Sequence, residues 1–196
     1  MSEPFNPILL DLTDHIDTER LHLRAPRPGD GATVHASVLE TLEDLRRFPS
    51  SMEWSLKEQT VATAEEYCRR SAADWLLRQE FPWLVFERGA DGRIGRHVGN
   101  CGIHRFDWKR RVFEIGWWCR RSAQGQGYIS EAARALVQYS FTQLGARRVW
   151  CYCDELNEKS WRVAERAGLQ HEGTIKSDRE DPDGTRRDMR IYAITR

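Results

Sequence analysis

The chain has 196 residues, enough for one sizeable domain or for one domain with an arm. Its 30 basic and 30 acidic side chains cancel, so net charge gives no reason to expect a nucleic-acid partner. No apolar run reaches the roughly 18 to 20 residues of a membrane span, and the N-terminus lacks the basic and apolar regions of a signal peptide. The five cysteines, an odd number, favour a reduced protein, so we expect a cytoplasmic location.

The first half of the chain predicts one strand and then two helices. The run TERLHLRAP alternates apolar and polar residues, which is typical of a strand. The run RPGDGATVHASVLETLEDLRRF reads as a turn followed by a helix. A second helix is predicted over TAEEYCRRSAADWLLRQ, with Thr63 and Glu66 as a capping box and with Tyr67 and Leu76 among the apolar residues at helical spacing.

The second half predicts mostly strands, with two further helices. In chain order we expect a strand in FPWLVFER, two antiparallel strands in HVGNCGIHRFDWKRRVFEIGWWCR, a helix in ISEAARALVQYSFTQLG, a strand in RRVWCYCDEL, a helix in NEKSWRVAERAGL and two closing strands in QHEGTIKS and TRRDMRIYAI. This order indicates an α/β domain with a mixed sheet. We expect residues 18–196 to form that domain and residues 1–17 to form an arm lying on it.

A strand that runs through QGQGY straight into a helix is suited to binding a phosphate group. Glycines permit positive φ and a close approach of the backbone, and a helix N-terminus offers free N–H groups and a positive dipole end. Arg120 and Arg121, just upstream, are expected to add positive charge. The residues expected to present amides to a pyrophosphate are Gln124, Gly125, Gln126, Gly127, Tyr128 and Ile129.

Two better-known phosphate motifs do not fit this turn. A Walker loop requires Lys-Ser or Lys-Thr after its last glycine, and neither pair is present. A dinucleotide fingerprint requires a third glycine, which is missing after Gly127. An ordinary tight turn before a helix remains the alternative.

The turn resembles the cofactor motif of the GNAT superfamily of acetyl-CoA-dependent N-acetyltransferases. That motif is Gln or Arg, two residues, Gly, one residue, then Gly or Ala; here Gln124, Gly127 and Ile129 hold the three places, and Ile129 departs from the pattern. GYISEA is similar to the corresponding run of the RimJ/RimL-like branch, which acetylates N-terminal alanine or serine of ribosomal proteins. TERLHLR, FEIGWW and NEKSWRVAERAGL resemble other parts of that branch in the expected order, so the resemblance runs from about residue 18 to residue 194.

The resemblance implies a GNAT-like fold with a mixed, mostly antiparallel sheet of about seven strands, flanked by helices and splayed between strands 4 and 5. The pantetheine arm of acetyl-CoA would enter that gap and bond to the backbone of Trp117, Trp118 and Cys119, as an added strand would. Because side chains alternate along a strand, Trp117 and Trp118 face opposite sides. One is expected to pack in the core and the other to wall the substrate cleft; packing of both in the core or on the surface is the alternative.

Transfer of an acetyl group to an amine requires a neutral amine, a polarised carbonyl and a stabilised thiolate. Glu114, on the strand that leads into the glycine turn, is the first candidate for the base. The alternative for Glu114 is a surface carboxylate or an ion pair with Arg111 or Arg147.

Two other carboxylates are candidates for the same role. The resemblance implies an acidic residue near the acceptor amine after the sixth strand, where Asp178 and Glu180 lie with Arg179 between them. His104 is expected to be a surface or packing residue.

The helix NEKSWRVAERAGL supplies the expected proton donor to the departing thiolate. The tyrosine that many GNAT enzymes use for this is replaced by Ala164, so Ser160, three residues after Asn157, is the available polar group. Asn157 is expected to bond the pantetheine amide, with helix capping as an alternative or additional role. Cys119 has no evident base beside it, so we expect direct attack in a ternary complex rather than an acyl-cysteine intermediate.

The sequence therefore predicts an acetyl-CoA-dependent N-acetyltransferase whose acceptor is a primary amine, with the N-terminal α-amine of a ribosomal protein as the first choice. A small amine (a polyamine, an amino acid or an antibiotic) and a non-catalytic acyl-CoA-binding role are the alternatives. Cys151 and Cys153 share a strand face without a His-rich segment nearby, so we expect no metal. We expect no nucleic-acid or membrane partner, and the oligomeric state is left open, a homodimer included.

Overall fold

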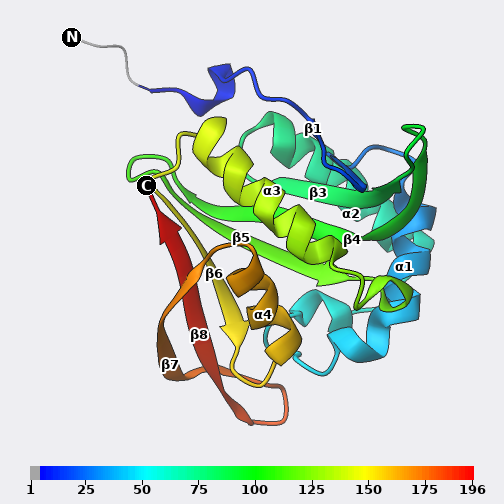
Figure 1. The fold of residues 1–196 in the computed structure, drawn as a ribbon. Coiled ribbons are helices and arrows are strands. Elements are labelled where there is room, and N and C mark those ends of the chain that lie inside the picture. The colour runs from blue at the N-terminus through cyan, green and yellow to red at the C-terminus, as the bar shows by residue number, and fades with distance from the viewer. Residues whose placement is uncertain (1–4) are drawn as a thin grey trace.

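An eight-stranded sheet runs through the computed structural model, which describes residues 5–196 (Figure 1). Its spatial order is β1-β2-β3-β4-β5-β6-β8-β7, and only β5 and β6 run parallel. This confirms the mixed, mostly antiparallel sheet that the sequence predicted. The strands are β1 His15–Asp17, β2 Leu21–Arg24, β3 Phe81–Arg88, β4 Ile94–Asp107, β5 Val112–Cys119, β6 Arg148–Asp154, β7 Gln170–Glu180 and β8 Arg186–Thr195.

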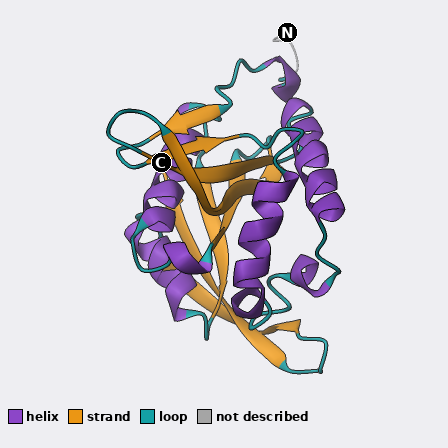
Figure 2. Ribbon diagram, turned by 90° about the vertical axis from the view of Figure 1, so that its right-hand side faces the viewer, coloured by secondary structure: helices purple, strands orange, loops and turns teal. Residues whose placement is uncertain are grey.

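Four α-helices cover the two faces of the sheet. They are α1 Gly31–Leu45, α2 Val61–Leu76, α3 Tyr128–Thr142 and α4 Glu158–Arg166. In Figure 1, α3 crosses the near face while α1 and α2 lie behind, and Figure 2 shows helices on both sides of the strands. Within residues 5–196, no helix combines the length and the apolar character that crossing a membrane would require.

Burial on both faces explains the long apolar runs of the central strands. Leu21 and Leu23 are fully buried, as the alternation in β2 predicted, and pack in the main core with α3 residues such as Leu136. Leu84 and Phe86 of β3 face the opposite way, where they form a second core with residues of α1 and α2. Six consecutive residues of β3 are therefore buried, as expected for a strand covered on both sides.

The start and the buried face of α2 differ from the prediction. The capping box is formed by Thr60 and Thr63, one turn earlier than the predicted pair, because Thr60 is the residue whose side chain reaches the N–H of Thr63. The buried face is Cys68, Ser71 and Trp75, at spacings of three and four, whereas Leu76 is 73% exposed. Apolar residues lie on two faces of this helix, and packing against the sheet determines which face is buried.

Part of the expected N-terminal arm belongs to the sheet. Residues 15–17 pair with β2 as an edge strand, which makes eight strands in place of about seven. Ahead of β1, the segment lies on the domain: the Tyr139 hydroxyl donates to the Thr13 carbonyl at 3.0 Å and Arg78 donates to the Leu10 carbonyl at 2.7 Å. Residues 1–4 of the expected arm lie outside the described residues.

Candidate active site

The sheet opens between β5 and β6. The two strands pair over only three residues each, and the last pair is Glu114 with Trp150. Beyond it β5 follows β4 as far as Cys119, while β6 follows β8 as far as Asp154. The predicted fourth and fifth strands are β5 and β6, because β1 was not among the predicted strands. The predicted splay between them is therefore present, and it begins at Glu114. The open backbone edge beyond Glu114 is the feature that an added strand-like ligand requires.

Two cavities meet at this gap. The first, of about 790 Å³, lies toward the glycine turn, and the second, of about 770 Å³, lies toward α2 and β7. Each is large enough for a sizeable ligand. The side chains that border both cavities are Met52, Trp117, Trp118, Asn157 and Ser160. Two ligands bound side by side would therefore meet at these five residues.

The glycine turn forms one wall of the first cavity. Gly125 and Gly127 have φ values of +77° and +79°, in the left-handed region that glycine adopts without strain, as the sequence predicted. Gly127 is the N-cap of α3, whose first N–H groups have no acceptor within the helix. A Cβ built on Gly125 would meet nothing within 4 Å, so the turn borders open space. The turn therefore fits a phosphate group bound by backbone amides.

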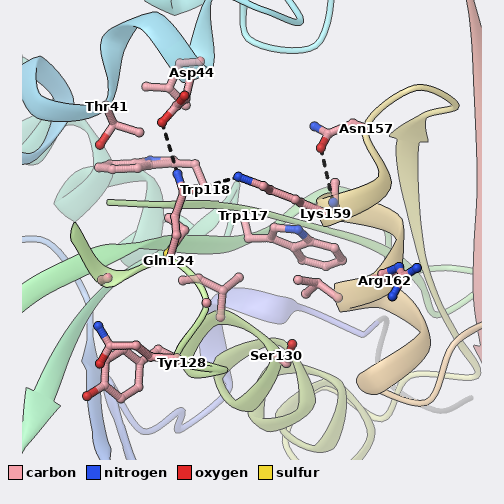
Figure 3. A pocket seen from close by; sticks show the side chains of 18 of the residues that line it. Thr41, Asp44, Trp117, Trp118, Gln124, Tyr128, Ser130, Asn157, Lys159 and Arg162 are labelled. Carbon is pink, nitrogen blue, oxygen red and sulfur yellow. Dashed lines mark hydrogen bonds between the residues drawn. The ribbon is translucent and has the colours of Figure 1, made fainter. Parts of the chain in front are cut away.

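All ten residues expected at the cofactor line the first cavity (Figure 3): Trp117, Trp118, Cys119, Gln124, Gly125, Gln126, Gly127, Tyr128, Ile129 and Asn157. Gln124 contributes its side chain in an unexpected way. Its amide donates to Asp44 of α1 at 3.2 Å and accepts from Lys159 of α4 at 3.0 Å, so it links the two helices that flank the cavity.

The positive charge around the first cavity comes from residues that the sequence analysis did not select. Arg120 pairs with Glu40 of α1, and Arg121 pairs with acidic residues of the same helix, so neither lines the cavity. The expectation for these two arginines was wrong because α1 neutralises them. The cations that do line the cavity are Arg47, Lys159, Arg162 and Arg166. The last three are spaced by three and four residues on α4, a one-face pattern that the sequence does contain.

The turn is held in place by a carboxylate that had no predicted role. Glu131, in the first turn of α3, accepts from the Thr18 hydroxyl at 2.6 Å, from the Arg20 N–H at 3.0 Å and from the Arg20 Nε at 2.8 Å. Arg20 also donates to the Gln126 carbonyl at 3.1 Å. Burial alone would raise the pKa of Glu131, but the bonds from Thr18 and Arg20 outweigh it and lower the pKa. The ion pair thus fastens the glycine turn to the start of β2.

We expect Glu131→Gln to lower the free energy of unfolding by about 1 to 2 kcal/mol at pH 7 and to weaken acetyl-CoA binding, because a charge-assisted bond is replaced by a neutral one. Since the folded pKa is lowered, the ionised form stabilises the fold above the ordinary glutamate value of about 4.3. The stability difference from wild type should therefore begin to shrink as the pH falls below that value and be lost as the pH passes through the lowered folded pKa. Glu43→Gln, at an ion pair whose carboxylate is 86% exposed, is the matched control and should cost under about 0.5 kcal/mol. Urea titrations at several pH values measure this, and a difference that is constant with pH would contradict it.

Trp117 and Trp118 lie on opposite faces of β5, as predicted, yet both line both cavities. Trp118 packs against α1 and α2 side chains, with its ring 5.9 Å from the ring of His97. Trp117 packs against the main core. The expected division into one core and one cleft residue is therefore wrong, because the splay uncovers both faces of this end of β5.

The Cys119 thiol is a poor nucleophile. Burial raises its pKa to about 11, and its sulfur donates to the neighbouring Arg120 carbonyl at 3.5 Å. A thiol with such a pKa remains protonated near neutral pH. This chemistry disfavours an acyl-cysteine intermediate.

Asn157 and Ser160 occupy the junction of the two cavities. Asn157 is the N-cap of α4, and its side-chain oxygen accepts from the Ser160 N–H at 3.2 Å. Helix capping by Asn157 is therefore present and leaves its NH₂ group available to a ligand. The Ser160 hydroxyl lies 3.5 Å from the Cys153 sulfur and borders both cavities.

Glu114 lines the second cavity as an ion pair. Its partner is Arg105 at 2.9 Å, and not Arg111 or Arg147 as the alternative reading proposed. Burial raises the pKa of Glu114, with Arg105 acting in the opposite direction. Arg105 sits in a bulge of β4 with a φ of +45°, which turns it toward β5. A bulge of this kind was not visible in the sequence.

The structure separates the residues near Glu114 into those that line the second cavity and those that do not. Arg179 lines the second cavity and donates to the Ser50 carbonyl at 2.8 Å, whereas Asp178 and Glu180 on either side of it do not line the cavity. His104, expected on the surface or in packing, also lines the second cavity. Its side chain is 36% exposed, so the expectation of a surface position stands, and the cavity adds a candidate role.

Buried polar groups behind Trp118 were also missed. His97 is 1% exposed; its Nδ1 lies 2.9 Å from the Ser37 hydroxyl and its Nε2 lies 2.8 Å from the Asn100 side-chain oxygen. Burial lowers the pKa of His97 to about 4, so it is neutral. The Asn100 amide donates in turn to the Tyr67 hydroxyl at 3.2 Å, which places that hydroxyl at the second cavity. The sequence around His97 does not indicate that this histidine is buried or which side chains it bonds.

The charges of the second cavity are largely compensated. Of its four carboxylates, Glu66 pairs with Arg70, Glu114 with Arg105 and Asp154 with Arg187. Lys57 and Arg179 add positive charge to the same cavity. Within residues 5–196, no group of three or more His, Cys, Asp or Glu side chains is placed to hold a metal ion.

Comparison with known proteins agrees with this geometry. Residues 20–170 match the acetyltransferase (GNAT) domain family. The chain is 38% identical over 162 residues to the uncharacterized N-acetyltransferase YnaD of Bacillus subtilis, covering 83% of this chain and 86% of that one. It is 28% identical over 178 residues to YdaF of the same organism, which carries the provisional name ribosomal N-acetyltransferase, covering 90% and 91% of the two chains.

The solved structure of RimL, a ribosomal alpha-N-protein acetyltransferase in complex with coenzyme A, shares the fold. The TM-score is 0.81 at 22% identity, over 92% of this chain and 97% of that chain. The splayed sheet, the glycine turn at the start of α3 and the family match together identify the protein: it belongs to the GNAT family of N-acetyltransferases, which take their acetyl group from acetyl-CoA.

Proposed function

We propose that this enzyme transfers the acetyl group of acetyl-CoA to the N-terminal α-amine of a protein, with a ribosomal protein as the acceptor, by direct attack in a ternary complex. The observation that carries the proposal is the pair of cavities that meet at Trp117, Trp118, Asn157 and Ser160. Two separate cavities with a common boundary allow both substrates to be bound at once with their reacting ends in contact. The names of RimL and YdaF support the choice of acceptor.

The first cavity suits acetyl-CoA. Backbone amides of the glycine turn and the N-terminus of α3 would hold the pyrophosphate, and Arg47 and Lys159 would contribute positive charge. The exposed edge of β5 from residue 115 to residue 119 would bond the pantetheine arm. The bound thioester supplies an activated acetyl group, so the protein needs no nucleophile of its own.

The second cavity would take the acceptor amine. An α-amino group has an ordinary pKa near 8, so it must lose a proton before it attacks. Two side chains that line this cavity can accept a proton: Glu114 and His104. Ser160, at the boundary, would donate a hydrogen bond to the departing thiolate.

A polyamine acceptor is less well supported. A ligand with several ammonium groups requires unpaired carboxylates, and three of the four in this cavity already have arginine partners. A cavity of about 770 Å³ with aromatic walls has room for the first residues of an extended peptide. The free thiols of all five cysteines favour a cytoplasmic site of action.

A panel of acceptors tests this proposal. We expect peptides with N-terminal alanine or serine to be acetylated with a kcat/KM at least about 10-fold above that for spermidine or free amino acids. An N-blocked peptide with an internal lysine, whose ordinary pKa is near 10.4, is the matched control and should react poorly. Thiol release and mass spectrometry measure the rate and the site. Faster reaction of a small amine would replace the protein acceptor, and tight acetyl-CoA binding without any transfer would indicate a binding module.

A further inference from the structure

The ring of His104 lines the second cavity on the face of the sheet that β4 and β5 form there; this face is called the floor of the cavity. That floor consists of three cross-strand pairs of β4 and β5: Asn100 with Trp118, Gly102 with Gly116, and His104 with Glu114. Because side chains alternate, these six residues share one face of the sheet, and all six line the cavity.

Two glycines make room for this ring. A Cβ built on Gly102 would lie 2.7 Å from His104 Nε2 and from its Cε1, a distance that real structures do not show. A Cβ on Gly116 would lie 3.6 Å from the same nitrogen. The Nε2 edge therefore rests on the glycine pair, displaced from Glu114 toward Trp118. This displacement brings the nitrogen closer to the boundary where the two cavities meet.

The other ring nitrogen faces a carboxylate. His104 Nδ1 lies 3.5 Å from Glu80 Oε2, just before β3. The hydrogen bond with His104 lowers the pKa of Glu80, which keeps the carboxylate ionised. A carboxylate beside Nδ1 favours the tautomer with its proton on that nitrogen, which leaves the lone pair on Nε2 of a side chain that lines the cavity.

We infer that His104 is the general base of the reaction and that Glu80 is its positioning residue; the inference rests on the proposed transfer to an α-amine. Nε2 takes one proton from the acceptor ammonium, which leaves a neutral amine. The amine nitrogen then forms a bond to the thioester carbonyl carbon, and the carbon–sulfur bond breaks with its electron pair on sulfur. The amide nitrogen loses its second proton to solvent, the thiolate is reprotonated, and His104 releases its proton to water.

His104 fits this role better than Glu114 does. Burial raises the pKa of Glu114, but its ion pair with Arg105 acts against that rise. The reference pKa of a carboxylate lies far below that of the amine, and the reference pKa of imidazole lies much closer to it. The charged groups that face His104 are Glu80 and Glu114. Arg105 and Arg179 partly offset the negative charge of Glu114. Glu114 would stabilise the imidazolium from the neighbouring strand.

The test is the dependence of kcat/KM on pH for an N-terminal alanine peptide. At pH 6.5 only about 3% of an α-amine with a pKa near 8 is neutral. His104→Gln should therefore lose up to about 30-fold at that pH and recover above about pH 9, where the amine is neutral without help. Glu80→Gln should keep the acid limb at a lower kcat/KM, because the imidazole remains but loses the carboxylate that orients it, and Glu114→Gln should keep the acid limb as well. His15→Gln, at a histidine 53% exposed on the edge strand β1, should leave the profile unchanged.

Two failures are distinguishable in the same data. If wild type acetylates no N-terminal peptide at any pH, the proposed function is wrong and the inference falls with it. If wild type does so but His104→Gln keeps the wild-type profile, or Glu114→Gln alone loses the acid limb, only the inference is overturned. Circular dichroism of each variant confirms that it is folded, and a folded His104→Gln protein is expected because the side chain is 36% exposed.

Discussion

Gly127→Asp should weaken acetyl-CoA binding at least about 100-fold while the protein remains folded. The new carboxylate would lie at the N-terminus of α3, facing the site proposed for the pyrophosphate. Two like charges about 5 Å apart repel by about 3 kcal/mol at an effective dielectric constant of 20, and a tenfold loss of affinity corresponds to about 1.4 kcal/mol. The fold should tolerate the change, because a Cβ at this position meets only the end of the Arg20 side chain, at 3.5 Å, and aspartate is a favoured N-cap.

Gly127→Asn is the matched control for this prediction. Asparagine has nearly the same size and the same cost of a positive φ, but it carries no charge. Calorimetric titration with acetyl-CoA should therefore show a much smaller loss for the asparagine variant. Equal affinities of the two variants would mean that the turn does not hold a phosphate group, and wild-type affinity in both would remove the turn from the cofactor site.

Ser160→Ala should lower kcat by about 10 to 100-fold with little change in acetyl-CoA affinity. Loss of one donor to a developing anion typically costs about 100 to 1,000-fold, and a soft thiolate with an ordinary thiol pKa near 8.5 needs less help. The hydroxyl lies in the first turn of α4, where the helix dipole favours negative charge on the acceptor. Its location at the boundary of both cavities is what a donor to the leaving sulfur requires.

A purely structural role for Ser160, as a cap of α4, would predict lost stability in place of lost activity. Asn157 and not Ser160 caps α4, so removal of the hydroxyl gives up only a weak contact to the Cys153 sulfur. We therefore expect the free energy of unfolding of Ser160→Ala to change by less than about 0.5 kcal/mol. Ser160→Thr keeps a hydroxyl and should retain more activity than the alanine variant. A normal kcat in Ser160→Ala would leave the thiolate without a protein donor.

The cofactor side of the site was predictable because consecutive residues form it. Gly125 and Gly127 set the backbone of the turn, and α3 begins directly after them, so a run of six residues specifies most of the amides that face the first cavity. The order of strands and helices followed from apolar periodicity in the same local way. The prediction of a buried face failed where apolar residues lie on more than one face of a helix, as in α2.

The second cavity, proposed to take the acceptor, was not predictable in this way because residues far apart in the sequence form it. Glu80, His104 and Glu114 come from three segments, and their relation depends on the register of β4 with β5. A bulge sets the partner of Glu114, and a pair of facing glycines sets the direction of the His104 ring. A single sequence does not encode register or bulges in any short pattern.

The sequence by itself therefore determined the α/β fold, the glycine turn and the family to which the chain belongs, since each depends on residues that are neighbours along the chain. Only the tertiary structure decided which cations face the first cavity, which side chains pair in the second cavity and where Asn157 and Ser160 lie relative to both. The physical reason is that the glycine turn at the first cavity is specified by local backbone conformation. The second cavity is lined by charged side chains, and packing between distant segments determines their partners.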